Sequence, residues 1–143
     1  MQADGGSILV LESEKSAMKR GAKILAEIKG YESCSIADHI YKPNKLGIQK
    51  VMGSALVQAG WHPTQIDMIN GHATATKLGD PVEAEALKEV LATPHIEMLK
   101  EEKFASGEEM DKSKLKDTVI TAYKGHLGHL NLASGSTEIA LCL

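Results

Sequence analysis

The sequence predicts an α/β fold in which helices pack on a mainly parallel sheet. Short apolar segments typical of buried strands alternate along the chain with segments of helical periodicity. Two of the apolar segments, residues 66–70 and 118–122, each run directly into a loop that contains a histidine. We therefore expect both loops at the end of a sheet, with their imidazoles converging there.

The N-terminal third is expected to contain two strands with a short helix between them. Residues 8–12 (ILVLE) form a continuous apolar run typical of a buried strand, and residues 24–28 (ILAEI) predict another. Ser13 is a suitable N-cap for a helix over residues 14–20, which Gly21 would end.

A longer amphipathic helix is predicted after a loop over residues 31–45 that contains Pro43. Apolar residues recur at helical spacing up to Gly60, which would stop the helix. We interpret this stripe as core packing and not as a binding face. Its members are Ile48, Val51, Met52, Ala55, Leu56 and Ala59.

The second half is predicted to hold two strands and two helices. Strand 66–70 is followed by a helix that Asp80 caps, with Pro81 in its first turn, and that runs to Leu91. More than half of residues 97–117 are charged, so we interpret residues 93–117 as a solvated insertion. Strand 118–122 then leads to a last helix that begins near Leu132.

The composition is that of an ordinary globular protein and excludes several function classes. The 143 residues are 43% hydrophobic and 24% charged, and the net charge of −3 without a basic stripe argues against a nucleic-acid partner. No apolar run approaches the roughly 20 residues that span a bilayer, and the start resembles no targeting signal.

The two cysteines give no disulfide framework, which suits a reducing compartment. We expect Cys142 to be a small buried hydrophobic residue and Cys34 to lie in a polar loop. Neither lies in a motif typical of a nucleophile.

The two histidine loops carry the chemistry that the sequence predicts. The first reads Asn-Gly-His-Ala-Thr-Ala-Thr-Lys-Leu-Gly-Asp over residues 70–80. The second reads Lys-Gly-His-Leu-Gly-His over residues 124–129, with Glu138 nine residues after His129. Two imidazoles at one place supply N–H donors for an anionic oxygen, as carbon–carbon bond formation through an enolate requires.

The same residues also allow plainer interpretations. His126 and His129 form an H-x-x-H pair, but no further ligand stands nearby at zinc-site spacing. Thr74 and Thr76 could satisfy turn backbone groups, and Asp80 could act only as a helix cap.

The two loops together resemble the β-ketoacyl-[acyl-carrier-protein] synthases. The first is similar to the family's Asn-Ala-His-Gly-Thr-Ser-Thr-x-x-Gly-Asp, and the second to its Lys-(Ser/Gly)-x-x-Gly-His. Residues 6–12 and 20–27 are also similar to family segments. The resemblance implies a thiolase-like fold and a decarboxylative Claisen condensation, in which malonyl-acyl carrier protein elongates an acyl thioester during fatty acid synthesis.

The resemblance also implies roles for individual residues. His72 and His129 would donate ring N–H groups to the thioester oxygen, with Lys124 beside them, held by Asp80 or Glu138. Thr74 and Thr76 would bind the phosphopantetheine arm of acyl carrier protein. No cofactor of its own is expected, apart from a structural monovalent cation. The positions that match its surroundings are Asn70, Glu83 and Glu138.

The chain resembles only the C-terminal half of such a synthase, well under half of a full-length enzyme. The family's nucleophilic cysteine lies N-terminal to this part, and neither cysteine matches it, so we expect the chain to be inactive alone. After His129 the family usually reads Leu-Leu-Gly-Ala-Ala-Gly, whereas residues 130–135 read Leu-Asn-Leu-Ala-Ser-Gly.

Partners and compartment follow from the resemblance in the same way. Acyl carrier protein and a second identical subunit are the expected partners, with no nucleic acid and no membrane. Ala73 and Gly125 are variants of the mitochondrial branch, which implies the mitochondrial matrix, with the cytoplasm as the alternative. The other functions left open are a non-catalytic module that binds acyl carrier protein or pantetheine, and a thiolase-type acyltransferase.

Overall fold

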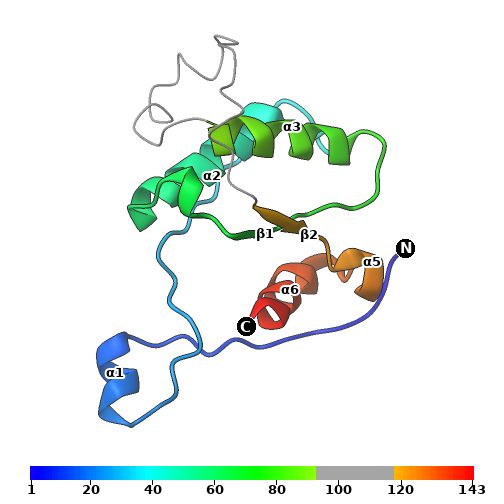
Figure 1. The fold of residues 1–143 in the computed structure, drawn as a ribbon. Coiled ribbons are helices and arrows are strands. Elements are labelled where there is room, and N and C mark those ends of the chain that lie inside the picture. Colours follow the sequence, from blue (N-terminus) through cyan, green and yellow to red (C-terminus); the bar gives the residue numbers. More distant parts are fainter. Residues whose placement is uncertain (93–117) are drawn as a thin grey trace. The chain divides into compact units, whose positions relative to one another are not determined.

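The computed structural model describes residues 1–92 and 118–143, which form two compact units (Figure 1). One unit comprises Met1–Ile28 and Tyr123–Leu143, and the other is Lys29–Ala122. Each unit carries one of the histidine loops. The predicted insertion at residues 93–117 lies outside the described residues.

The larger unit is an α/β layer. Its strands β1 (Met68–Asn70) and β2 (Val119–Thr121) pair in parallel, with Ile69 opposite Ile120. Helices α2 (Lys45–Ala59) and α3 (Gly79–Ala92) pack against each other on one side of the strands (Figure 1). The parallel pairing confirms that both histidine loops follow the carboxyl ends of neighbouring strands.

Local capping explains where α2 begins and ends. The side chain of Asn44 accepts a hydrogen bond from the Gly47 N–H at 3.0 Å, and Gly60 closes the helix with a φ of 67°. Positive φ costs glycine little, so Gly60 is a suitable end for the helix. The helix is as predicted, but Gly47, Gln49 and Gly53 are its buried residues, and the predicted core stripe is only partly buried.

The smaller unit is formed by the N-terminal and C-terminal segments of the chain, which hydrogen-bond to each other. Ala3 donates its N–H to the His129 carbonyl at 3.1 Å, and His129 donates to the Met1 carbonyl at 2.9 Å. Further along, Ser7 Oγ lies 2.7 Å from Ser136 Oγ on helix α6 (Ser134–Cys142). The N-terminal segment therefore runs alongside the second histidine loop and the last helix, as Figure 1 shows.

Two short elements complete this unit. Helix α1 (Glu14–Lys19) is capped by the Ser13 side chain, as predicted. Helix α5 (Lys124–Leu127) and a 3-10 turn (Asn131–Ala133) precede α6, and α5 was not predicted, because its residues were interpreted as a loop. In the larger unit a second 3-10 turn (Pro63–Gln65) precedes β1.

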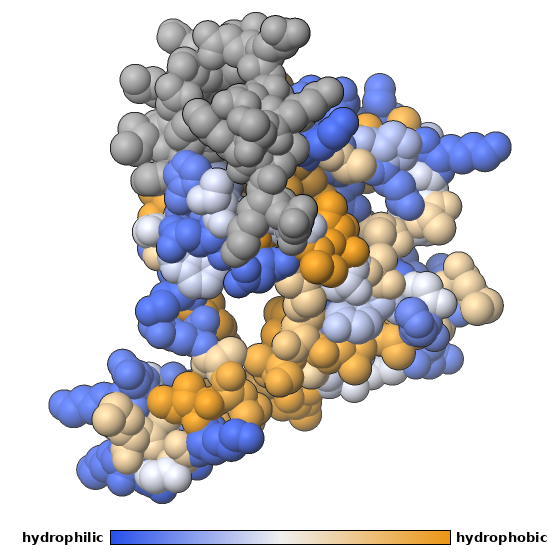
Figure 2. All heavy atoms as spheres, viewed as in Figure 1, coloured by the Kyte–Doolittle hydropathy of each residue, from blue (hydrophilic) through white to orange (hydrophobic). Residues whose placement is uncertain are grey.

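The predicted strands at residues 8–12 and 24–28 are wrong. Neither segment forms a ladder with another described segment, and most of their large apolar side chains are exposed, from 47% at Ile24 to 91% at Ile8. A strand exists only with a hydrogen-bonded neighbour, which local sequence does not supply. Figure 2 shows apolar side chains in orange on the segments that adjoin α1.

Cys142 is exposed, so the prediction that it is buried is also wrong. Within the described part of the chain, no helix is long and apolar enough to cross a bilayer.

Candidate active site

The His72 loop extends directly from strand β1. Gly71 donates its N–H to the Thr121 carbonyl at 2.9 Å, which continues the β1–β2 pairing to the residue before the histidine. The chain then turns sharply, with φ values of 37° at Ala73 and 60° at Ala75. Positive φ is uncommon for residues with a Cβ atom, so the loop needs tertiary contacts to hold it.

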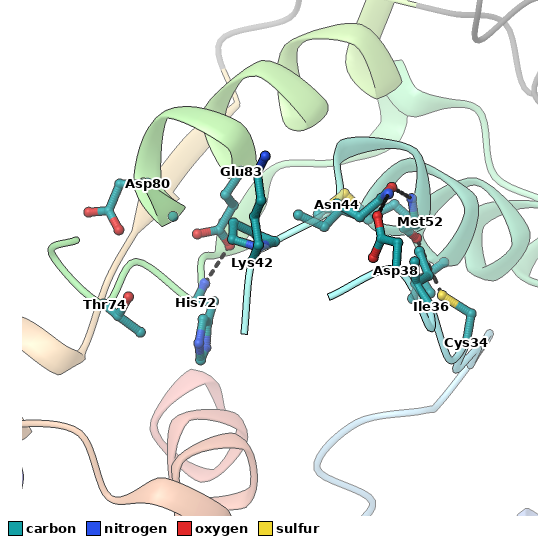
Figure 3. Close-up of a pocket in the computed structure, with 15 residues that line it drawn as sticks. Cys34, Ile36, Asp38, Lys42, Asn44, Met52, His72, Thr74, Asp80 and Glu83 are labelled. Atoms are coloured by element: carbon teal, nitrogen blue, oxygen red, sulfur yellow. Dashed lines mark hydrogen bonds between the residues drawn. The ribbon is translucent and has the colours of Figure 1, made fainter. Parts of the chain in front are cut away.

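The carboxylate of Glu83 supplies those contacts. From the first turns of α3 it accepts the N–H of His72 at 2.6 Å and the N–H of Ala73 at 2.8 Å, one on each oxygen. Figure 3 shows the His72 ring directed away from Glu83. Glu83 thus fixes the backbone of His72 and leaves the imidazole pointing elsewhere.

Thr76 holds the remainder of the loop to the start of α3. Its hydroxyl accepts the Gly79 N–H at 3.0 Å, while Asp80 Oδ1 accepts the Thr76 N–H at 3.3 Å. Asp80 therefore lies in the first turn of α3 and holds the loop through the Thr76 N–H. The capping role that was predicted for Asp80 belongs to Thr76. A Cβ atom at residue 79 would lie 2.5 Å from the Thr76 hydroxyl, which explains the glycine there.

A pocket of about 530 Å³ lies within this unit beside His72 and Thr74 (Figure 3). Its apolar wall includes Ile48, Val51 and Met52, so these residues of the predicted core stripe line a pocket. Its carboxylates are engaged in holding the fold, since Asp38 accepts from the Asn44 amide at 2.9 Å. The other lining residues are Cys34, Ile36, Lys42, Pro43, Gly47, Gly79, Asp80 and Glu83.

His129 is the histidine of the second loop and lies in the smaller unit. Its Nδ1 accepts the Asn131 N–H at 3.0 Å and lies 3.1 Å from Ser134 Oγ. A nitrogen that accepts an N–H carries no hydrogen of its own, so the neutral ring bears its hydrogen on Nε2. The backbone of His129 is fixed by the N-terminal segment, whose Gln2 forms a parallel bridge with it.

Lys124 and Glu138 form a buried ion pair in the same unit as His129. Their Nζ and Oε1 atoms are 2.6 Å apart, and the two side chains are 6% and 7% exposed. The sequence offered Asp80 or Glu138 as the partner of Lys124, and the structure shows that the partner is Glu138. Such a pair is structurally important because it is buried: removing one partner leaves the charge of the other in a buried place, which is strongly destabilising.

The predicted site residues thus form two groups. His72, Thr74, Thr76, Asp80 and Glu83 gather around the loop after β1, and Asn70 precedes them on the strand. His129, Lys124 and Glu138 gather in the other unit. Among residues 1–92 and 118–143, no three His, Cys, Asp or Glu side chains are grouped so as to hold a metal ion.

Three contributors to the site were missed from the sequence. The contacts of Ser134 and Asn131 with the His129 ring, and the bridge from Gln2, involve residues to which no motif pointed. The departure of residues 130–135 from the family pattern was the one available signal.

Comparisons with known proteins identify the family. Residues 25–143 match the family described as β-ketoacyl synthase, C-terminal domain. The mitochondrial 3-oxoacyl-[acyl-carrier-protein] synthase of Arabidopsis thaliana is 39% identical over 137 residues, which cover 94% of this chain and 26% of that protein. The 3-oxoacyl-[acyl-carrier-protein] synthase homolog of Saccharomyces cerevisiae is 34% identical over 137 residues, which cover 94% of this chain and 27% of that protein.

Solved structures agree. The ishigamide ketosynthase/chain length factor superposes with a TM-score of 0.75 and 34% identity, over 98% of this chain and 30% of that one. A type II polyketide synthase ketosynthase in complex with its acyl-carrier protein superposes with a TM-score of 0.70 and 28% identity. The match covers 92% of this chain and 28% of that one.

The chain spans about a quarter of the length of the curated relatives it matches. Its fold is that of the ketosynthases, and the chain belongs to the β-ketoacyl synthase family, of which it matches the C-terminal domain.

Proposed function

We propose that this chain is the histidine-bearing part of a β-ketoacyl-[acyl-carrier-protein] synthase that elongates fatty acyl chains. The observation that carries the proposal is the arrangement at His129, whose Nδ1 accepts the Asn131 N–H, so that the neutral ring bears its hydrogen on Nε2. That ring nitrogen is a donor suited to an oxygen that becomes negatively charged.

The reaction is a decarboxylative condensation. The malonyl thioester loses carbon dioxide, and the electrons of the broken C–C bond form an enolate whose charge lies on the thioester oxygen. The enolate carbon then attacks an acyl thioester carried on a cysteine, and that cysteine thiolate leaves. Donors aimed at the enolate oxygen act on the transition state more than on the bound substrate.

His72 and His129 are the proposed donors. The His72 side chain is presented by a loop that Glu83 and the β1–β2 pairing hold in place. Losing one such donor costs about 2.7–4 kcal/mol of transition-state stabilisation. Lys124, held by Glu138, would keep the second histidine loop in shape.

The phosphopantetheine arm is proposed to enter the pocket beside His72. Thr74 lines this pocket and is the better placed of the two threonines, because the Thr76 hydroxyl already accepts the Gly79 N–H. The apolar wall formed by Ile48, Val51 and Met52 suits the methylene groups of such an arm.

A structural monovalent cation remains part of the proposal, with Asn70 and Glu83 of the larger unit as its surroundings, whereas Glu138 pairs with Lys124. Carboxylate and amide oxygens are suitable ligands for a hard cation. Each oxygen of the Glu83 carboxylate accepts one backbone N–H and has further lone pairs with which it could bind a cation.

Acyl carrier protein and a second identical subunit are the proposed partners. The complex of a related ketosynthase with its acyl-carrier protein supports the first of these. The mitochondrial names of similar proteins support the mitochondrial matrix as the compartment.

The acylated cysteine is proposed to lie outside these 143 residues. Intact-mass measurement after incubation with an acyl thioester should then show no stable adduct on Cys34 or Cys142. An acyl adduct on either cysteine would contradict this proposal. In the complete synthase, His72→Ala and His129→Ala should each abolish release of carbon dioxide from malonyl-acyl carrier protein, while the acyl-enzyme still forms.

A further inference from the structure

Two donors converge on one ring nitrogen of His129. The Asn131 N–H lies 3.0 Å from Nδ1, and Ser134 Oγ lies 3.1 Å from the same atom. Asn131 reaches the ring because its φ is 54°, a left-handed conformation that asparagine tolerates better than most residues.

The direction of the Ser134 contact can be assigned from its other partner. Ser134 Oγ accepts the Leu130 N–H at 3.0 Å, which uses one oxygen lone pair. Nδ1 already accepts an N–H and has no hydrogen to offer, so the hydroxyl hydrogen must be the donor to Nδ1. Ser134 is only 5% exposed, so bulk water does not compete for this hydrogen bond.

We propose that Ser134 is a positioning residue for His129: its hydroxyl, together with the Asn131 N–H, fixes the ring hydrogen on Nε2 and the orientation of the imidazole. Its importance for catalysis rests on the proposed function, whereas the hydrogen-bond assignment does not. Ser134 stands where the family pattern has alanine, so this chain holds its histidine through an additional side-chain donor.

A purely structural role would give Ser134 only the Leu130 N–H, at the start of α6. The two roles differ at Nδ1, which only the proposed hydrogen bond affects. A spectroscopic signal from this nitrogen therefore separates them.

The test is ¹⁵N NMR of the 143-residue chain labelled in its histidine rings, at a pH where the rings are neutral. In the natural chain we expect a hydrogen on Nε2 of His129 and none on Nδ1. Ser134→Ala should shift the Nδ1 resonance toward that of a ring nitrogen with fewer hydrogen bonds, and Ser134→Thr should restore it. Ser134→Cys, which keeps the volume with a weaker donor, should act like Ser134→Ala and replaces it if that variant unfolds.

Ser136→Ala is the matched control. Its hydroxyl lies on the same helix but bonds to Ser7 Oγ at 2.7 Å, so its loss should leave the Nδ1 resonance unchanged. A hydrogen on Nδ1 in the natural chain, or an Nδ1 resonance that does not respond to Ser134→Ala or Ser134→Cys, would overturn the proposal.

In the complete synthase, Ser134→Ala should lower kcat roughly two- to tenfold with KM unchanged, the effect of one neutral hydrogen bond. If the ring signal responds while kcat does not, the hydrogen-bond assignment stands and the importance of Ser134 for catalysis fails, whereas His129→Ala tests the proposed function itself.

Discussion

Lys124 Nζ lies 2.6 Å from Glu138 Oε1, with both side chains more than nine-tenths buried. The pair connects α5, which holds the start of the second histidine loop, to α6. A buried pair of this kind is weak support for stability in itself, but losing one member leaves a charge buried without compensation. The consequence can be tested without any assumption about activity.

Lys124→Met should destabilise the chain by about 3–5 kcal/mol, because the Glu138 carboxylate then remains in a buried place. The double variant Lys124→Met with Glu138→Met should recover most of that loss. Denaturant unfolding of the three proteins measures both effects. A single variant as stable as the natural chain would show that the carboxylate reaches water.

Glu83→Gln should loosen the His72 loop. A glutamine has one oxygen, so the N–H of either His72 or Ala73 faces an amide N–H₂ group, at a cost of about 1–3 kcal/mol. Amide hydrogen exchange should show lower protection at these two residues. Glu85→Gln, an exposed change on the same helix, is the control and should leave their exchange rates as they are.

Thr74→Val and Thr76→Val should separate binding from loop structure. Thr76→Val removes the acceptor for the Gly79 N–H and should cost about 1 kcal/mol of stability, as the loss of a helix cap does. Thr74→Val should leave stability within about 0.5 kcal/mol of the natural value and raise KM for the carrier-protein substrate in the complete synthase. Equal effects of both variants on stability would contradict this division.

Gly30→Ala should destabilise the larger unit by about 1–3 kcal/mol, the usual cost of overpacking. An added Cβ would lie 2.1 Å from the Ala55 carbonyl oxygen, and backbone atoms cannot easily move aside. Thermal or denaturant unfolding measures the change. Gly6→Ala is a suitable control, since an added Cβ there meets nothing within 4 Å among the described residues.

The hydrogen bond from Arg20 holds the pKa of Glu12 below its usual value, with a further contribution from Ser16. A lowered pKa gives stability that is present above the unfolded pKa of about 4.3 and is lost as the pH falls through the folded value. Arg20→Gln should therefore raise the Glu12 midpoint in an NMR titration, whereas Lys19→Gln should not. The effect on stability should be small, because the pair is on the surface.

Features that depend on neighbours in the chain were predictable from the sequence. Helix α1 begins after Ser13 and helix α2 ends at Gly60, as expected, because a cap bonds to backbone groups within a few residues. The strands before both histidine loops were also predicted, although each is three residues long. The resemblance of the two loops was enough to indicate the family, which the comparisons confirm.

Features that depend on distant partners were decided by the tertiary structure. The segment at residues 8–12 has the composition of a strand, but no described segment pairs with it. Glu83 was predicted beside a cation, which stays a prediction, and only the structure shows that its carboxylate accepts the N–H groups of His72 and Ala73. Motif spacing gives the residue types that a loop offers, whereas hydrogen bonds form between whichever groups the folded chain brings within reach.

The sequence by itself therefore determined the family, the α-helices other than α5, and the two histidines. The three-dimensional structure determined what fixes those histidines: a carboxylate from α3 for His72, and a serine hydroxyl with a left-handed asparagine for His129. The physical reason is that helix propensity and capping act over a few residues, while the position of a ring depends on the packing of several elements around it.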